Sequence, residues 1–186
     1  MRRVAPALVL ALSAAALAAC SSKGPSDRSD WERQNEGRLA KAEAPPAPDL
    51  PAYPQNDRLV PFYVTSASDF KFFIDRASLS VGRDRIVRYA LVARSGAGAE
   101  NVSFEGINCL SNEYILYAVG VQGKWVGRPT EWRAIEPRSV QRWHNALRSE
   151  YFCPNNVPIA DAAEGLNALE RGGHPYVNSS GTPRSR

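Results

Sequence analysis

Short, turn-rich connections between apolar segments constrain this chain more than any other feature. Gly, Ser, Asp or Asn residues bound these segments, as in Gly82-Arg83-Asp84 and Ser95-Gly96-Ala97-Gly98. Connections of this length cannot hold crossover helices, so the sequence predicts a mainly antiparallel sheet. The segments are rich in β-branched and aromatic residues and are expected to form about four to six strands, at 70–74, 86–94, 101–107 and 114–119, with further ones around 124–126 and 131–135.

Helical signals follow the predicted strands. Residues 137–152 carry one apolar face, and Pro137 suits a first helical turn. A second helix is expected between Asp161, which with Glu164 forms a capping-box-like pair, and Gly172-Gly173 at its end. Strands first and helices second predict an α+β domain with two C-terminal helices packed on one face of the sheet. The apolar face of the first helix consists of Val140, Trp143, Leu147 and Tyr151.

The N-terminus is typical of a secretory signal. A basic start, Met1-Arg2-Arg3, precedes an apolar stretch that contains Pro6 and falls short of the roughly 20 residues needed to span a bilayer. Leu17-Ala18-Ala19-Cys20 resembles the lipobox of bacterial lipoproteins. The resemblance implies that residues 1–19 are removed, that Cys20 is acylated, and, with Ser21 following, that the protein passes to the outer membrane. The alternative is an ordinary signal peptide with an incidental cysteine.

Composition divides the remaining chain into a tether, a domain and a tail. Seven of the 14 prolines fall between Ser21 and Pro61, which favours an extended spacer over a packed core. We therefore expect a lipidated, flexible tether over 20–58, one α+β domain over 59–174 and a disordered tail over 175–186. After removal of Arg2 and Arg3, 21 basic residues face 19 acidic ones, and this near balance argues against nucleic acid as a partner.

Two cysteines remain if Cys20 carries lipid. In an oxidising periplasm, Cys109 and Cys153 most simply form a disulfide that links the sheet to the first helix. A redox-active pair is less favoured, because the two are not arranged as Cys-x-x-Cys.

Four segments together resemble a known family. They are VGRDRIVRYALVARSGAGAENVSFEGINC (81–109), WRAIEP (132–137), RWHNALRSEYFCP (142–154) and GGHP (172–175). These segments resemble the CNP1-like family, named after a cryptic neisserial protein, over roughly residues 51–175. The resemblance implies a lipoprotein of the Gram-negative envelope. It implies no activity, cofactor or catalytic residue.

No catalytic or metal-binding motif stands out. The two histidines lie outside His-x-x-His and His-Glu-x-x-His patterns, so no metal or cofactor is expected. His144 lies beside the apolar helix face and is interpreted as a hydrogen-bonded core histidine, whereas His174 is interpreted as a surface residue. The carboxylates Glu105, Glu113 and Glu131 remain candidates for a glycosidase-like pair, although their separation cannot be read from sequence.

The most suggestive stretch is 125–143, where tryptophans alternate with arginines. Both residue types are enriched in binding hot spots. Trp125, Arg128, Trp132 and Arg133 are the candidate ligand or partner surface, and Trp143 is expected in the core. The leading hypothesis is a membrane-anchored, non-enzymatic binding or scaffolding module facing the periplasm, with peptidoglycan or an envelope protein as partner. The alternative is a small envelope hydrolase acting on glycan or peptide through Glu131 or His144.

Overall fold

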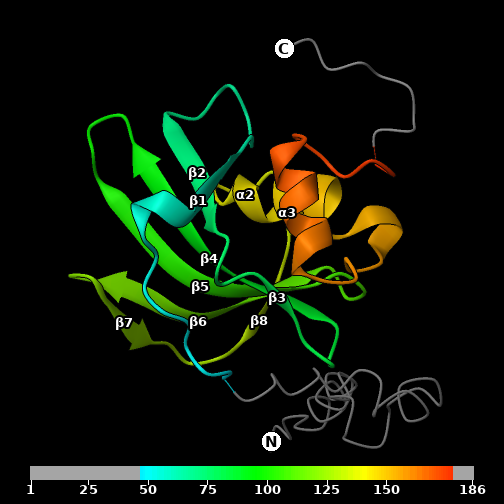
Figure 1. The fold of residues 1–186 in the computed structure, drawn as a ribbon, viewed down its shortest axis with the longest axis horizontal. Coiled ribbons are helices and arrows are strands. Elements are labelled where there is room, and N and C mark those ends of the chain that lie inside the picture. Colours follow the sequence, from blue (N-terminus) through cyan, green and yellow to red (C-terminus); the bar gives the residue numbers. More distant parts are fainter. Residues whose placement is uncertain (1–46, 178–186) are drawn as a thin grey trace, which may run out of the picture. The chain divides into compact units, whose positions relative to one another are not determined.

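The computed structural model describes residues 47–177, and it confirms the predicted α+β class (Figure 1). One antiparallel sheet is followed by two helices, α2 and α3. The sheet holds eight strands, more than the four to six expected. Strand β1 has four residues, contains Pro61 and ends the Pro-rich segment, and β3 has two residues, so neither stands out in the sequence. The strands are β1 (Leu59–Phe62), β2 (Phe70–Asp75), β3 (Ser80–Val81), β4 (Ile86–Ser95), β5 (Glu100–Asn108), β6 (Glu113–Val121), β7 (Lys124–Gly127) and β8 (Trp132–Ala134).

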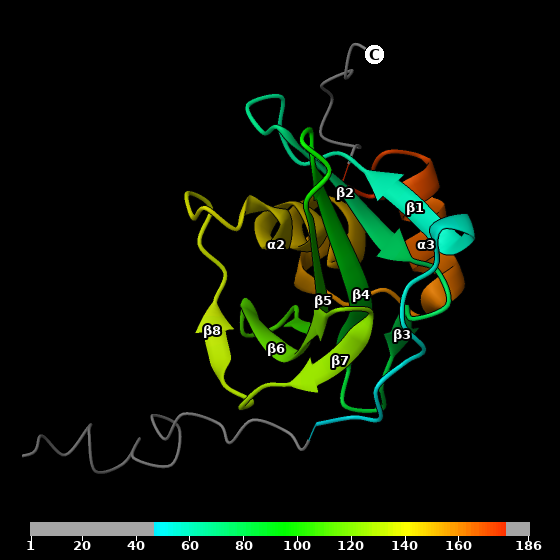
Figure 2. The same cartoon turned by 90° about the vertical axis from the view of Figure 1, so that its left-hand side faces the viewer.

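The sheet is a meander with two side branches. Strands follow the order β1-β2-β4-β5-β6-β7, while β3 pairs with β4 and β8 pairs with β6. Figure 2 shows that the sheet is strongly twisted and curved, so that β7 and β8 swing away from β2 and β4. Curvature is helped by a β-bulge, because Glu105 pairs with Leu116 but the preceding Phe104 pairs with Ala118. Tyr117 is the extra residue of β6 at this point.

The first helical segment is shorter than predicted. It begins as α2 (Arg142–Ala146) and continues as a π-helical turn, η2 (Leu147–Phe152), so Pro137 lies outside it. The hydroxyl of Ser139 accepts a hydrogen bond from the backbone N–H of Gln141 at 2.9 Å, which competes with an earlier helical start. Val140 is consequently 96% exposed instead of lying on the apolar face.

The second helix begins and ends as its sequence predicts. Asp161 caps α3 (Ala162–Glu170) by accepting from the backbone N–H of Glu164 at 2.9 Å. At the other end, Gly172 has a positive φ of 74°, and the N–H groups of Gly172 and Gly173 bond the carbonyls of Leu169 and Ala168. This is the Schellman pattern, which satisfies the last carbonyls of the helix.

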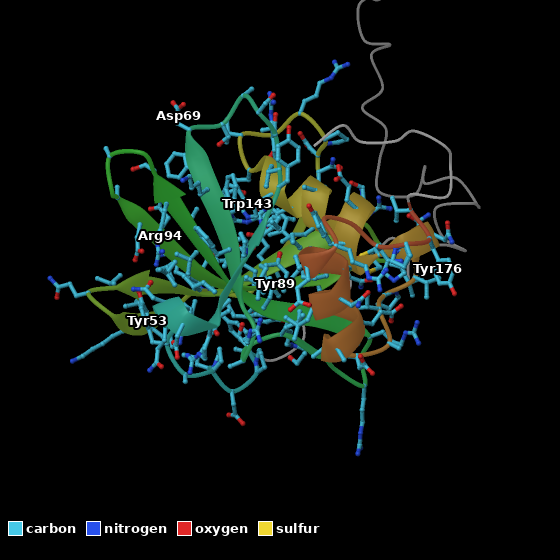
Figure 3. The ribbon with its side chains drawn as sticks, turned by 45° about the horizontal axis from the view of Figure 1, so that its top comes forward. Tyr53, Asp69, Tyr89, Arg94, Trp143 and Tyr176 are labelled. Atoms are coloured by element: carbon cyan, nitrogen blue, oxygen red, sulfur yellow. A yellow bond between two sulfur atoms is a disulfide. The ribbon has the colours of Figure 1, made fainter. Side chains whose placement is uncertain are left out.

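Both helical segments pack on the same face of the sheet. Tyr89 and Leu91 of β4 share one buried cluster with Leu147, Tyr151 and Leu169 of the helices. Figure 3 shows Tyr89 in the middle of this layer, beside α3. A smaller cluster lies on the opposite face, and it consists of Ile86, Ala90, Phe104, Ile115, Tyr117, Ala118 and Trp132.

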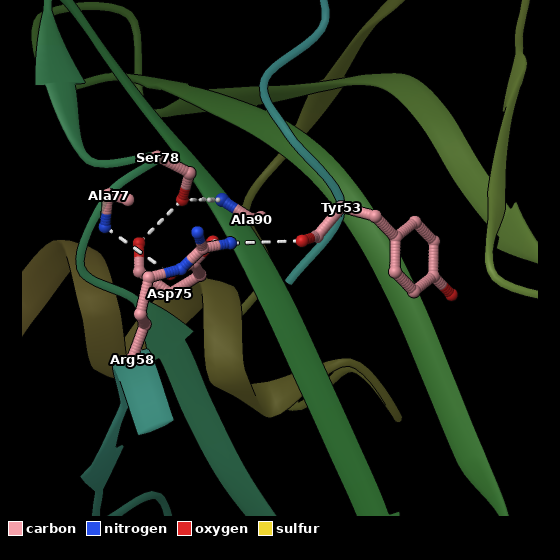
Figure 4. Close-up of polar contacts among 6 residues, drawn as sticks. All are labelled: Tyr53, Arg58, Asp75, Ala77, Ser78 and Ala90. Atoms are coloured by element: carbon pink, nitrogen blue, oxygen red, sulfur yellow. Dashed lines mark hydrogen bonds and ion pairs between the residues drawn. The ribbon is translucent and has the colours of Figure 1, made fainter. Parts of the chain in front are cut away.

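A segment that precedes the predicted domain boundary at residue 59 also contacts the sheet. The indole N–H of Trp125 donates to the Pro51 carbonyl at 2.8 Å, and the Tyr53 ring packs on the Trp125 ring. Arg58 forms a two-pronged ion pair with the buried carboxylate of Asp75, at 3.1 Å for each contact, and also donates to the Tyr53 carbonyl (Figure 4). These contacts fix the end of the predicted tether to β2 and β7.

The predicted disulfide between Cys109 and Cys153 is present. It joins the end of β5 to the end of η2 with a Cα–Cα distance of 5.4 Å, and both cysteines are buried. The bridge therefore connects the sheet to the segment that carries His144. The predicted signal (1–19), Cys20, most of the tether and residues 178–186 of the tail lie outside the described residues. Among the helices of residues 47–177, none has the length and apolar character needed to cross a bilayer.

Candidate ligand pocket

A pocket of about 370 Å³ opens between the sheet and the start of α2. Its volume lies in the range of small-molecule sites, and its lining is mostly apolar. Four strands and the segment around α2 contribute, because the helix N-terminus lies over the sheet on its helix-covered face. The lining residues are Phe70, Phe72, Leu91, Ala93, Asn101, Val102, Ser103, Glu105, Leu116, Val119, Gly120, Val140, Gln141 and Trp143.

A buried carboxylate lies in the wall of this pocket. Alternation along β5 places Asn101, Ser103 and Glu105 on the same face as the core residue Ile107. Glu105 is 3% exposed and sits at the β-bulge. A carboxylate in such a place must be hydrogen-bonded, since burial of an unpaired charge is costly.

Three side chains donate hydrogen bonds to Glu105. Its Oε2 atom accepts from the Tyr89 hydroxyl at 3.0 Å and from Nε2 of His144 at 2.9 Å. Its Oε1 atom accepts from the Ser103 hydroxyl at 2.7 Å. Ser103 lines the pocket with Glu105, whereas Tyr89 and His144 do not, so the hydrogen bond to Oε1 is the one made by another lining residue.

His144 is buried beside the carboxylate. It is 2% exposed, as the interpretation of a hydrogen-bonded core histidine requires. Its ring stacks on that of Tyr114, with centroids 3.6 Å apart and an interplanar angle of 20°. Tyr114 in turn donates to the side-chain oxygen of Gln141 at 2.7 Å, which ties the imidazole to the pocket rim.

Electrostatics keep Glu105 ionised and Tyr89 neutral. Burial raises the pKa of Glu105. The electrostatic attraction of His144 and the hydrogen bonds from His144, Ser103 and Tyr89 outweigh this effect, so the pKa is lowered. Burial, reinforced by the Glu105 charge, raises the pKa of Tyr89 well above its ordinary value. The wall of the pocket therefore carries a carboxylate whose partners remain hydrogen-bond donors.

Aromatic rings form one side of the pocket. Trp143 is half-buried, packs 5.7 Å from Phe72 and shares the pocket with Phe70, which is 38% exposed. Figure 3 shows Trp143 over the sheet near the start of the helical segment. Trp143 thus packs against the core, as expected, and also contributes a surface to the pocket.

The Trp and Arg residues predicted as a surface are divided by the structure. Trp132 is 6% exposed and belongs to the opposite-face cluster, so its assignment to a binding surface is wrong. The reason is that β8 pairs with β6 and turns Trp132 toward Ile115, its partner in the sheet. Trp125 is half-buried under the segment around Pro51, whereas Arg128 and Arg133 are exposed.

His174 is also placed differently from its prediction. It is 1% exposed, not a surface residue, because the turn after α3 folds it back against Glu150 and Glu164. Nε2 of His174 lies 2.9 Å from Oε1 of Glu164, and the backbone N–H of Tyr176 donates to Nδ1. This pair lies outside the pocket and closes the C-terminal end of the described chain onto α3.

The three carboxylates considered as a glycosidase pair are not brought together in the pocket. Glu105 lines it, while Glu113 is half-buried on β6 and Glu131 is exposed. No group of His, Cys, Asp and Glu side chains arranged to hold a metal ion occurs within residues 47–177. The sequence signal for Glu105 was available, since a charged residue two positions before Ile107 in a strand shares its buried face.

The described residues form a small antiparallel α+β domain that is cross-linked by one disulfide. The family model of the CNP1-like family matches residues 41–170, most of the chain, and the protein belongs to this family. No curated protein and no solved structure matches the chain.

Proposed function

We propose that the protein is a lipid-anchored module of the cell envelope whose domain binds a small, mostly apolar ligand in the pocket over Glu105. The observation that carries the proposal is a pocket of ligand size with aromatic walls and one ionised, hydrogen-bonded carboxylate. Anchoring is supported by the Leu17-Ala18-Ala19-Cys20 lipobox, and the location we propose is the outer membrane, facing the periplasm.

The connectivity of the polar groups favours binding over hydrolysis. In a serine hydrolase the imidazole lies between the hydroxyl and the carboxylate, so that it can take the hydroxyl proton. Here Glu105 lies between Ser103 and His144, and the Ser103 hydroxyl donates to the carboxylate instead. A two-carboxylate mechanism would need a second acid facing Glu105, and among the lining residues that the structure describes Glu105 is the single acid.

A neutral apolar probe tests the pocket directly. The full chain should bind N-phenyl-1-naphthylamine with enhanced probe fluorescence, and Phe70→Ala should weaken this binding several-fold because it removes an aromatic wall. Leu110→Ala is the matched control, since Leu110 is 75% exposed and lies outside the pocket. Equal binding by the wild type and both variants would contradict the proposal.

Anchoring is tested separately. Cys20→Ala should abolish incorporation of labelled palmitate and leave the precursor uncleaved at this site. Cys109→Ala/Cys153→Ala is the control, because these thiols are in the disulfide and the label should be retained. Palmitate incorporation unchanged by Cys20→Ala would refute the anchor.

A second binding role concerns the edge formed by β7 and β8. Arg128 and Arg133 are exposed, and no side-chain partner of either occurs among the described residues. Exposed guanidinium groups suit carboxylate or phosphate groups of an envelope polymer such as peptidoglycan, or of an envelope protein. This role is compatible with a ligand in the pocket.

A further inference from the structure

We infer that the ligand of the pocket is an organic cation, a small molecule with an aromatic or aliphatic body and a protonated amine that donates to Oε1 of Glu105. This inference rests on the proposed function, because it names the chemical class of the ligand for the same pocket.

The first argument is the unused capacity of Glu105. A carboxylate oxygen accepts about two hydrogen bonds. Oε2 already has two donors, Tyr89 and His144, whereas Oε1 has one, Ser103, within the part of the chain that the structure describes. The free position belongs to Oε1, the oxygen bonded by the lining residue Ser103, so we place the ligand donor there, where it displaces no protein contact.

The second argument is charge. The carboxylate is ionised, and neither lysine nor arginine is present among the described lining residues. The basic side chain that contacts it, His144, bonds Oε2 from outside the lining. An entering ammonium group gains a charge-assisted hydrogen bond in a site of low dielectric constant, whereas an entering carboxylate meets repulsion. Fatty acids and other apolar anions are therefore disfavoured, although the apolar walls alone would accept them.

The third argument is the aromatic wall. Phe72 and Trp143 pack together with ring centroids 5.7 Å apart, and Phe70 lies 6.4 Å from Phe72. The faces of Phe and Trp rings attract cations, and the attraction grows when water is removed. Aromatic rings beside a single carboxylate are the combination that recognises amines.

Three small molecules of matched shape test the inference. They are 2-phenylethylamine, 2-phenylethanol and phenylacetate, which are cationic, neutral and anionic at neutral pH. Titration of the isotope-labelled full chain, followed by NMR, should move the Trp143 indole signal and leave that of Trp132, in the opposite-face cluster, in place. We expect the amine to bind about ten-fold more tightly than the alcohol, and phenylacetate to bind more weakly than both.

Glu105→Gln should reduce the preference for the amine over the alcohol to within about two-fold, because the charge is lost while the shape remains. Glu164→Gln is the matched control. Glu164 is also bonded to a histidine but lies outside the pocket, so this variant should keep the full preference for the amine over the alcohol. If Glu105→Gln does not fold, the wild-type series still decides. If the alcohol or phenylacetate binds as tightly as the amine, the inference of a cationic ligand is wrong, while the proposal of a ligand pocket is retained. Absence of Trp143 shifts with all three would overturn the pocket itself.

Discussion

Two histidine–glutamate pairs with the same nitrogen–oxygen distance occur in the described part of this chain, and they differ in what surrounds the carboxylate. Nε2 of His144 lies 2.9 Å from Glu105, and Nε2 of His174 lies 2.9 Å from Glu164. Both imidazoles are buried, but the Glu105 side chain is 4% exposed and that of Glu164 is 35% exposed. The same contact therefore serves a buried site in one case and a partly solvated helix end in the other.

The two pairs also differ in how the acceptor positions of the carboxylate are used. Glu164 also accepts from the backbone N–H of Ala160 at the start of α3, and this hydrogen bond, with that of His174, lowers its pKa. Nδ1 of His174 accepts from the Tyr176 backbone N–H, and Nε2 donates to Glu164. Each oxygen of Glu164 has one donor within the fold, and solvent reaches the rest of this side chain, which is 35% exposed. The Glu105 side chain, by contrast, is 4% exposed and keeps one acceptor position on Oε1 that no described residue fills.

The largest effect is expected from breaking the buried pair. Glu105→Gln replaces an acceptor by an amide that faces three donors, and removal of one partner of a buried pair costs about 3–5 kcal/mol in unfolding free energy. Glu164→Gln should cost about 1 kcal/mol or less, because solvent reaches that side chain and Gln can still accept from Ala160. Urea denaturation of the full chain measures both. Equal costs would remove the distinction between the two pairs.

Loss of the disulfide is expected to have the next largest effect on stability, and to affect the two helical segments unequally. Cys109→Ala/Cys153→Ala should lower the unfolding free energy by about 2–5 kcal/mol, mostly because the unfolded chain gains conformational entropy without the bridge. Because the bridge ends at η2, which continues α2, its loss should loosen the helical segment of His144 more than α3. Amide hydrogen exchange should therefore speed up more in 142–152 than in 162–170. Equal acceleration in both helices would show that the bridge does not specifically hold His144.

Acid should weaken the first pair in a defined pH window. The pKa of Glu105 is lowered in the folded chain, so its contribution is fully present above the ordinary Glu pKa of about 4.3 and is lost as pH falls through the folded pKa. The stability gap between wild type and Glu105→Gln should then narrow steadily below about pH 4. Urea denaturation from pH 7 to pH 3 measures this gap. A gap that stays constant down to pH 3 would show that the Glu105 charge contributes nothing.

Strand pairing was predictable because local signals and tertiary packing agree there. Turn residues bound β4, β5 and β6, and the apolar residues of these strands require burial. The order of these strands in the sheet and their antiparallel direction follow from these two signals. The start of α2 was not predictable from periodicity, because Ser139 diverts the backbone although Val140 matches the apolar spacing. The short strand β3 is decided by its pairing with β4 and leaves almost no sequence signal.

The pocket was only partly predictable. The sequence singled out Glu105, His144 and Trp143 separately, but their meeting depends on the β-bulge and on how α2 crosses the sheet. Trp132 was misassigned because an alternation of Trp and Arg does not say which face a tryptophan takes, and pairing with β6 decides it. The cysteine pairing was easier to predict, because assigning Cys20 to the lipid leaves two cysteines, which can form a single bridge.

The smallest stability effect is expected at the edge, where Arg128 and Arg133 offer the strongest contrast to the buried pairs. Arg128→Ala with Arg133→Ala should change the unfolding free energy by no more than about 0.5 kcal/mol, because both residues are exposed and without side-chain partners among residues 47–177.

If this edge binds an anionic polymer, the same double variant should lose retention on isolated sacculi. Arg138→Ala with Arg142→Ala removes two other exposed arginines near α2 and should retain it. Retention equal to wild type in a folded Arg128/Arg133 variant would exclude the edge as the polymer site. Loss in both pairs would instead reveal general attraction by positive charge, because nonspecific electrostatics do not distinguish two exposed arginine pairs.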